Sequence, residues 1–467
     1  MRLHTPPAGV PSWRCAAYCS PSSSSPSAPA PPNHQERSSL QVPVVHRDAV
    51  FPPAPGAPPG GLLRLRHGAD AGHYTVQLAS LHPTAAADDD DRLRSPVLSG
   101  LPFDSGEYFA VIGVGDPSTR ALVVIDTGSD LIWLQCAPCR HCYRQMTPLY
   151  DPRSSSAYRR IPCASHRCRR DVLRYPGCDA RTGGCVYMVM YGDGSASSGD
   201  LATDRLVFPS DTHVHNVTLG CGHDNRGLFE SAAGLLGVGR GNLSFPTQVA
   251  AAYGRVFSYC LGDRMSRAKD SSSYLVFSRT PELPSTAFTP LRTNRRRPSL
   301  YYVDMVGFSV GGEPVTGFSK ASLALDPATG RGGIVVNSGT AISRFARDAY
   351  AAVRDAFNSR AAAGGMRKLD TNFSVFDACY DLRGRGHATV RVPSIVLHFA
   401  GGMDMALPPA NYLVPVEGSD RRTYFCLGLQ AADDGLNVLG NVQQQGFGVV
   451  FDVELERIGF APNGCSA

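Results

Sequence analysis

The sequence lacks any long apolar run. No stretch approaches the roughly 18 consecutive apolar residues that a membrane-spanning helix needs, and the last residues lack the hydrophobic tail of a lipid-anchor signal. We therefore expect no transmembrane helix and no membrane partner. With 43% hydrophobic and 9% aromatic residues, the chain can still bury a sizeable core, which excludes wholesale disorder. Its 467 residues exceed what one core needs, so we expect more than one domain or lobe.

A strong excess of one charge is also missing. The 45 basic and 40 acidic residues give a formal net charge of +5, which is weak support for a polyanionic partner. The compact basic run Arg295-Arg296-Arg297 lies between Asn294 and Pro298, a context typical of a solvated turn. We expect no nucleic-acid partner.

Acidic residues are absent from the first 35 positions. This Ser/Pro-rich segment, 1–35, has little of the apolar run that a secretory signal peptide requires, so it fits a weak signal peptide, a plastid transit peptide or a misassigned start. Residues 36–100 contain a Pro/Gly-rich stretch at 52–61 and nothing that resembles an independent domain. We interpret 36–100 as a removable pro-segment with linkers, which predicts a zymogen.

Helical periodicity is scarce after residue 106. The chain there consists of short β-type runs, such as Tyr108–Val114, punctuated by glycine, proline and asparagine. The best helical pattern covers Phe345–Phe357. The folded part is therefore predicted to be all-β, with few short helices.

The β-rich region contains an internal repeat. An apolar strand leads into Asp126-Thr127-Gly128-Ser129, and a similar strand leads into Asn337-Ser338-Gly339-Thr340. Each turn is followed by two apolar residues and a glycine, which end at Gly237 and Gly440, at offsets of 111 and 103 residues. The repeat predicts two equivalent β lobes with a cleft between two facing turns.

These motifs resemble those of the pepsin-like aspartic proteases, in particular the plant nepenthesin-like branch. The resemblance also includes Trp133, the segment Tyr191–Ser195, the closing segment Val450–Pro462 and a cysteine-rich insert at Cys136–Cys185. It implies a two-lobed fold, with an N-terminal lobe at 101–290 and a C-terminal lobe at 291–467. It further implies a monomer that hydrolyses protein or peptide substrates without a metal or cofactor.

The resemblance assigns roles to the two turns. Asp126 is the base carboxylate with Ser129 as its hydroxyl partner, while Thr127 and Ser338 tie the turns together. Gly128 and Gly339 allow close backbone approach, Thr340 supports the second turn, and Tyr191 with Gly192 forms a flap over the substrate. In such a site, two carboxyls share one proton because like charges in contact cannot both ionise, and together they activate a water molecule.

The second turn departs from this family pattern, because Asn337 stands where the second aspartate is needed. An amide has the shape of a protonated carboxyl, but it cannot give up or take back the catalytic proton. One interpretation is an intact site with little or no peptidase activity. Two others are a sequence variant or error at this position, and deamidation that regenerates aspartate.

Cysteine usage predicts an oxidising compartment. Cys15 and Cys19 lie in the leader, and the other twelve cysteines, an even number, predict six disulfides. Metal-type spacing of Cys136, Cys139 and Cys142 beside His141 is the alternative, which the many downstream cysteines disfavour. The resemblance suggests the pairs Cys142–Cys221, Cys260–Cys465 and Cys379–Cys426, with the remaining cysteines, which include Cys163, Cys168, Cys178 and Cys185, pairing within the insert.

Three sequons, at Asn216, Asn242 and Asn372, predict a glycoprotein. Together with the cysteines they favour a secreted, apoplastic or vacuolar protein, with the chloroplast as the alternative.

Two other motifs fit their usual functions poorly. Gly307-Phe308-Ser309-Val310-Gly311 matches the serine-hydrolase pattern, but it follows an alternating strand and enters a glycine pair, which favours a β-hairpin. His46-Arg47-Asp48 resembles a kinase triplet without the other kinase motifs.

The sequence therefore predicts an aspartic-type endopeptidase, impaired by Asn337. The alternative is a non-catalytic protein on the same scaffold that binds peptides, proteins or glycosidases, as plant xylanase inhibitors exemplify.

Overall fold

The computed structural model describes residues 39–44, 97–99, 107–170, 177–209, 211–227, 229, 231–262, 273–279, 283–382, 390–432 and 435–466, with backbone alone for 39–44, 97–99, 169–170 and 466. The leader at 1–35, most of the pro-segment, and the triplet His46-Arg47-Asp48 lie outside the described residues.

A ten-stranded sheet carries the first turn of the repeat. Its strand order is β2-β3-β4-β11-β5-β10-β9-β8-β7, with β6 paired to β9. In its strand β4, Val123 and Ile125 face one hydrophobic cluster while Leu122 and Val124 face another, so both sides are buried and the strand is a continuous apolar run. The strands are β2 (Val97–Ser99), β3 (Tyr108–Val114), β4 (Thr119–Asp126), β5 (Trp133–Gln135), β6 (Arg159–Arg160), β7 (Gly177–Asp179), β8 (Gly184–Met190), β9 (Ala196–Phe208), β10 (Thr212–Arg226) and β11 (Gly234–Gly237).

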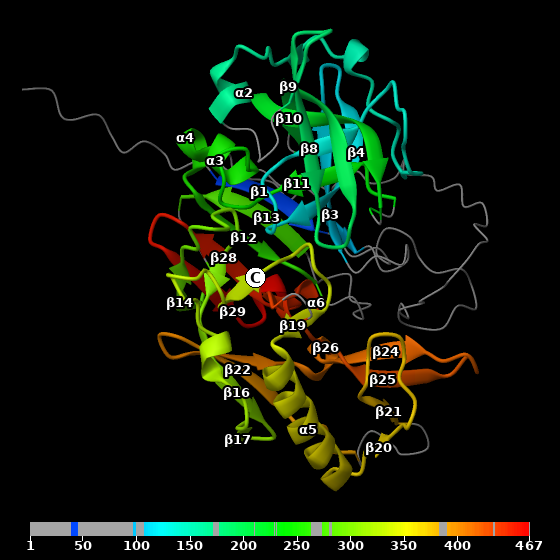
Figure 1. The fold of residues 1–467 in the computed structure, drawn as a ribbon, viewed down its shortest axis with the longest axis vertical. Helices are drawn as coiled ribbons and strands as arrows, with labels where there is room; N and C mark the ends of the chain where they lie inside the picture. The colour runs from blue at the N-terminus through cyan, green and yellow to red at the C-terminus, as the bar shows by residue number, and fades with distance from the viewer. Residues whose placement is uncertain are drawn as a thin grey trace, which may run out of the picture. The chain divides into compact units, whose positions relative to one another are not determined.

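An eleven-stranded sheet carries the second turn and connects early and late parts of the chain (Figure 1). Its order is β1-β13-β12-β28-β29-β14-β15-β18-β27-β19-β26, and the backbone of β1 lies at one edge, antiparallel to β13. The strands are β1 (Ser39–Val44), β12 (Val256–Cys260), β13 (Ser273–Ser278), β14 (Ala287–Arg292), β15 (Tyr302–Val303), β18 (Ile334–Val336), β19 (Ser343–Phe345), β26 (Leu429–Ala431), β27 (Asn437–Leu439), β28 (Gly448–Asp452) and β29 (Arg457–Ala461).

Two four-stranded sheets complete the second half of the chain, in the orders β17-β16-β22-β23 and β20-β21-β25-β24. The strands are β16 (Met305–Val310), β17 (Glu313–Pro314), β20 (Arg367–Lys368), β21 (Cys379–Asp381), β22 (Ile395–Phe399), β23 (Met403–Leu407), β24 (Leu413–Glu417) and β25 (Thr423–Leu427). The shorter helices are α2 (His166–Arg170), α3 (Phe245–Gln248), α4 (Ala250–Tyr253) and α6 (Asn441–Gln444), with 3₁₀ turns η3 (Pro152–Ser154), η4 (Lys320–Ser322), η6 (Pro409–Asn411) and η7 (Gly464–Ser466).

The long helix α5 (Arg347–Ala363) occupies the window expected from the helical pattern at 345–357, but it begins two residues later and extends further. Apart from the adjacent pair Ala349 and Tyr350, its buried residues recur every three or four positions, which is the spacing of one helix face. They are Ala349, Tyr350, Val353, Phe357 and Ala361. The helix ends at Ala363 and Gly364 caps it, where the periodic pattern stops.

The predicted all-β, two-lobed architecture is confirmed, since strands dominate the described residues. Within the described part of the chain, no helix is both long and apolar enough to cross a membrane.

The six expected disulfides are confirmed, and one predicted pairing is wrong. Cys142 does not reach Cys221: Cys136 bonds to Cys221, and Cys139 bonds to Cys142. Strand β5 runs parallel to β10, with Leu134 opposite Cys221, and Cys136 directly follows β5. The Cα atoms of Cys136 and Cys221 are therefore only 5.3 Å apart, a distance that a disulfide can span. The predicted bonds Cys260–Cys465 and Cys379–Cys426 are present. Pairing within the insert was expected without named partners, and the structure pairs Cys163 with Cys178 and Cys168 with Cys185.

Candidate active site

The two repeat turns begin at equivalent points of the two large sheets. Strand β4 ends at Asp126, which lies opposite Gly237 of the parallel strand β11. Strand β18 runs parallel to β27, and the next residue, Asn337, donates its backbone N–H to Leu439 O at 3.0 Å. Both turns therefore follow the carboxyl end of a buried strand that is paired in parallel, and the rigid sheet holds their side chains in place.

Reciprocal hydrogen bonds join the two turns. The backbone N–H of Thr127 donates to Ser338 Oγ at 3.1 Å, and the backbone N–H of Ser338 donates to Thr127 Oγ1 at 3.0 Å. Each hydroxyl in turn donates to a strand carbonyl of the other half, Thr127 Oγ1 to Val336 O at 3.0 Å and Ser338 Oγ to Ile125 O at 2.7 Å. Because both side chains are fully buried, these bonds fix the turns against each other.

Asp126 is a buried carboxylate held by its own turn. Its Oδ1 accepts the Gly128 N–H at 2.8 Å, and its Oδ2 accepts the Ser129 hydroxyl at 2.5 Å. Burial raises the pKa of Asp126 above its ordinary value, the two hydrogen bonds oppose that shift, and the charge of Asp193 adds to it. The pKa of Asp126 is therefore higher than in water, so the protonated carboxyl is favoured. This suits a group that exchanges a proton under acidic conditions.

Asn337 occupies the equivalent position in the second turn. Its Oδ1 accepts the Gly339 N–H at 2.9 Å, just as Asp126 accepts that of Gly128, and its Nδ2 donates to Thr340 Oγ1 at 3.0 Å. The amide thus satisfies the contacts that a carboxylate would make, with the Thr340 hydroxyl as acceptor.

Both turns require glycine, because Gly128 faces Asn337 of the second turn and Gly339 faces Asp126 of the first. A Cβ atom on Gly128 would lie 2.6 Å from Asn337 Nδ2, and one on Gly339 would lie 2.4 Å from Asp126 Oδ1. Both distances are shorter than van der Waals contact. This reciprocal approach brings the Asp126 carboxylate and the Asn337 amide to one location.

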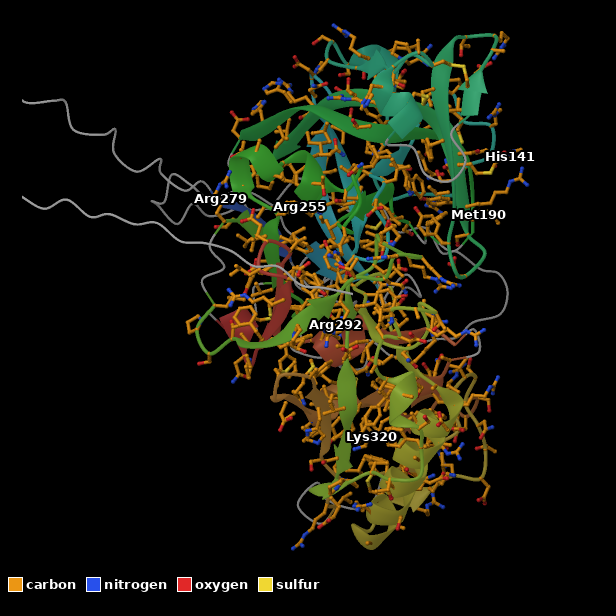
Figure 2. The ribbon with its side chains drawn as sticks, turned by 60° about the vertical axis from the view of Figure 1, so that its left-hand side comes forward. His141, Met190, Arg255, Arg279, Arg292 and Lys320 are labelled. Carbon is orange, nitrogen blue, oxygen red and sulfur yellow. A yellow bond between two sulfur atoms is a disulfide. The ribbon has the colours of Figure 1, made fainter. Side chains whose placement is uncertain are left out.

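The segment at 191–195 forms the tip of the β8–β9 hairpin. The Tyr191 hydroxyl accepts a hydrogen bond from Trp133 Nε1 at 2.8 Å, and Asp193 closes the turn by accepting from the backbone of Ser195 at 2.9 Å. Burial and the Asp126 charge hold the pKa of Tyr191 well above its usual range, so its hydroxyl remains protonated. Met190, just before the tip, is 74% exposed (Figure 2).

Phe229 completes an aromatic group that the sequence reasoning missed. Its ring meets Trp133 edge-on at 4.9 Å between centroids and Tyr191 at 5.6 Å. Such contacts stabilise the hairpin tip beyond their buried area. No local sequence signal marks Phe229, since the contact arises from three separate segments.

The remaining motifs have other structural contexts. The Gly307–Gly311 segment forms the predicted hairpin of β16 and β17. Ser309 Oγ shares a hydrogen bond with His398, whose other ring nitrogen lies 2.7 Å from Asp404, but Ser309 lies within a strand opposite Val396 and not at a strand–helix elbow.

In the described residues no group of three or more histidine, cysteine or acidic side chains has the arrangement of a metal site.

The sequon residues Asn216, Asn242 and Asn372 are all exposed.

Comparisons with known proteins find relatives that cover most of the chain. Residues 108–278 match a family profile described as "Xylanase inhibitor N-terminal", and residues 300–462 match "Xylanase inhibitor C-terminal". Aspartyl protease family protein 2 of Arabidopsis thaliana is 47% identical over 372 residues, which cover 80% of this chain and 74% of that protein. Aspartic proteinase nepenthesin-1 of Nepenthes gracilis is 34% identical, covering 78% and 79% of the two chains.

Solved structures show the same fold at lower identity. The crystal structure of edgp matches with a TM-score of 0.62 and 22% identity, over 77% of this chain and 94% of that one. Basic 7S globulin from soybean matches with a TM-score of 0.59 and 20% identity, over 77% and 94%.

Proposed function

The chain belongs to the family of pepsin-like plant aspartyl proteases, and from that premise we propose that it is an aspartic-type endopeptidase whose catalytic pair is impaired. Protein or peptide substrates would bind between an N-terminal lobe at 101–290 and a C-terminal lobe at 291–467, with Tyr191 and Gly192 closing over them. The protein would act as a monomer, and its precursor would be a zymogen.

Asp126 is the group that carries the chemistry in this proposal. As a carboxylate, it would accept a proton from a water molecule that attacks the scissile carbonyl. The observation that carries the proposal is the pair of hydrogen bonds from Gly128 and Ser129, which hold the Asp126 carboxylate in one orientation. The reciprocal Thr127–Ser338 bonds support it by fixing the carboxylate relative to the second turn.

Asn337 limits the reaction at the second position. Its amide can donate a hydrogen bond to the substrate carbonyl or to the water, but it has no proton to transfer. Catalysis would then rest on Asp126 alone, with positioning and hydrogen bonding in place of the missing acid. We therefore propose slow turnover by the natural chain.

Asn337 also favours a second candidate function. A pepsin-fold protein that binds peptides, proteins or glycosidases needs no second carboxyl, and the family profiles that match this chain are described as xylanase inhibitors. Both functions fit a secreted, apoplastic or vacuolar protein with six disulfides and glycans at the exposed sequons.

Pepstatin, a peptide with a hydroxyl group that replaces the attacked carbonyl, separates the two functions. The natural chain should bind immobilised pepstatin in acid and hydrolyse an acid-denatured protein slowly. Asp126→Asn should abolish hydrolysis, and free pepstatin should inhibit it. Pepstatin binding without any Asp126-dependent hydrolysis would support the binding protein instead.

A further inference from the structure

Arg344 occupies the position in the second half that Trp133 occupies in the first. Each lies seven residues after its turn residue, Asp126 or Asn337. Strand pairing confirms the equivalence: Trp133 lies opposite Leu235 of antiparallel β11, and Arg344 lies opposite Val438 of antiparallel β27.

The parallel neighbours correspond as well, because Gly220 of β10 lies beside Trp133 and Gln430 of β26 lies beside Arg344. The two residues are therefore equivalent by sequence offset and by both strand pairings.

The side chain of Arg344 leaves β19 on the face that points away from the main core. Its neighbours Ser343 and Phe345 are buried, Ser343 Oγ donating to Gln443 Oε1 at 2.5 Å and Phe345 packing in the main hydrophobic cluster. Alternation along a strand sends Arg344 to the opposite side. Trp133, on the corresponding face of β5, contacts the hairpin residue Tyr191.

The Arg344 guanidinium has no anionic partner in the part of the chain that the structure describes. Its Nε is buried and has no hydrogen-bond acceptor there, and none of the ion pairs between described residues includes it. Other partly buried arginines do pair with aspartate, Arg205 with Asp116 at 2.6 Å and Arg354 with Asp377 at 2.7 Å. A buried donor without an acceptor is costly. Arg344 is the counterpart of Trp133, whose side chain contacts the hairpin residue Tyr191, so a ligand that lies under the hairpin would supply the missing acceptor.

We propose that Arg344 is a binding site for a carboxylate of the bound peptide, the side chain of aspartate or glutamate. The proposal rests on the proposed function, since it needs a peptide between the two halves of the chain. Guanidinium and carboxylate match in charge and in planar geometry, and a site built to hydrogen-bond one group rejects an analogue that lacks it. Arg344 would thus make this protein select acidic peptides.

Peptide pairs that differ only by Glu or Gln at one position, scanned along the peptide, test this selection. The Asn337→Asp variant serves for cleavage, and fluorescence polarisation with the natural chain measures binding without turnover. At about pH 5.5, we expect one position where Glu is preferred roughly 10- to 100-fold over Gln. The preference should fall toward pH 3.5 as the peptide carboxyl, with an ordinary pKa of about 4.3, becomes protonated.

Arg344→Gln in either background should reduce the Glu preference to about one, and Arg344→Lys should keep part of it because the charge remains. Arg331→Gln, the same charge change at an exposed residue, should keep the full preference. Thermal unfolding of each variant shows whether it is folded.

Peptides that are bound or cleaved with no Glu preference, or with a preference that Arg344→Gln leaves intact, would overturn the role of Arg344 alone. Failure to bind or cleave any peptide would overturn the proposed function as well.

Discussion

Replacing Asn337 by aspartate should raise the peptidase activity of this chain without changing its fold. The substitution exchanges an NH₂ group for an oxygen of similar size. The Gly339 N–H, now 2.9 Å from Asn337 Oδ1, can still donate to the side chain. The Thr340 hydroxyl, which now accepts from Nδ2 at 3.0 Å, can rotate and donate instead, as the Ser129 hydroxyl donates to Asp126.

The expected gain follows from the proton chemistry of the site. With two carboxyls at one location, the pair shares a proton, so one group can act as acid while Asp126 acts as base. A positioned acid or base typically contributes about 10²- to 10⁴-fold. We therefore expect Asn337→Asp to hydrolyse protein at least about 100-fold faster than the natural chain, which corresponds to about 2.7 kcal/mol of activation free energy.

The assay compares kcat/KM for a fluorescence-quenched peptide between about pH 3 and pH 5, where a carboxyl pair can hold one proton. The double variant Asp126→Asn/Asn337→Asp is the matched control and should be inactive. Equal rates for the natural chain and Asn337→Asp would refute the reasoning, unless the natural chain had deamidated.

Mass analysis of the peptide that contains residue 337 decides that point. We expect no deamidation, because the Ser338 N–H that would have to attack the amide is held by Thr127 Oγ1 at 3.0 Å.

Three other perturbations of the two turns have measurable consequences. Gly339→Ala places a Cβ atom 2.4 Å from Asp126 Oδ1 and should lower the free energy of unfolding, measured by denaturant titration, by about 1–3 kcal/mol. The control Gly192→Ala adds a Cβ atom that meets no atom within 4 Å and should change the free energy of unfolding by less than about 0.5 kcal/mol. Thr127→Val and Ser338→Ala should each lower the free energy of unfolding by about 1–3 kcal/mol. Because the two side chains share their hydrogen bonds, the double variant should lose less than the sum of the single variants, and strict additivity would contradict this coupling. Because burial raises the pKa of Asp126, its ionisation destabilises the folded chain as the pH rises above the ordinary value of 3.8, so Asp126→Asn should raise the melting temperature near pH 7 and leave it unchanged near pH 3. An equal shift at both pH values would show that the effect is not titration.

Much of the architecture was predictable because its signals are local or repeated. The buried strand β4 is a continuous apolar run, so its sequence indicates burial on both faces. The repeat of that strand and turn at Asn337 places two equivalent sites in one fold, and the structure brings them into contact through Thr127 and Ser338. Helix α5 was located by its periodicity, although its end depends on where Gly364 stops the pattern.

Features that depend on tertiary neighbours were not predictable in the same way. The partner of Cys221 depends on the parallel pairing of β5 with β10, which no spacing of cysteines reveals. Phe229 contacts Trp133 only because a distant loop folds back. Arg344 was not among the predicted site residues, although the repeat contains a signal for it. Trp133 lies seven residues after Asp126, and Arg344 lies seven residues after Asn337.

The substitution at Asn337 is structurally silent because the site is supported by groups other than the second carboxyl. The turns are joined by the hydroxyls and backbone amides of Thr127 and Ser338, and each turn residue is oriented by the N–H group two positions later. The amide oxygen of Asn337 accepts that N–H in the same geometry as the carboxylate of Asp126, so the turn accommodates either side chain. Aspartate at position 337 would differ from asparagine in its charge and in its exchangeable proton, and not in these contacts. For this reason the rate comparison with Asn337→Asp, rather than any feature of the fold, decides whether this member of the family is a working peptidase.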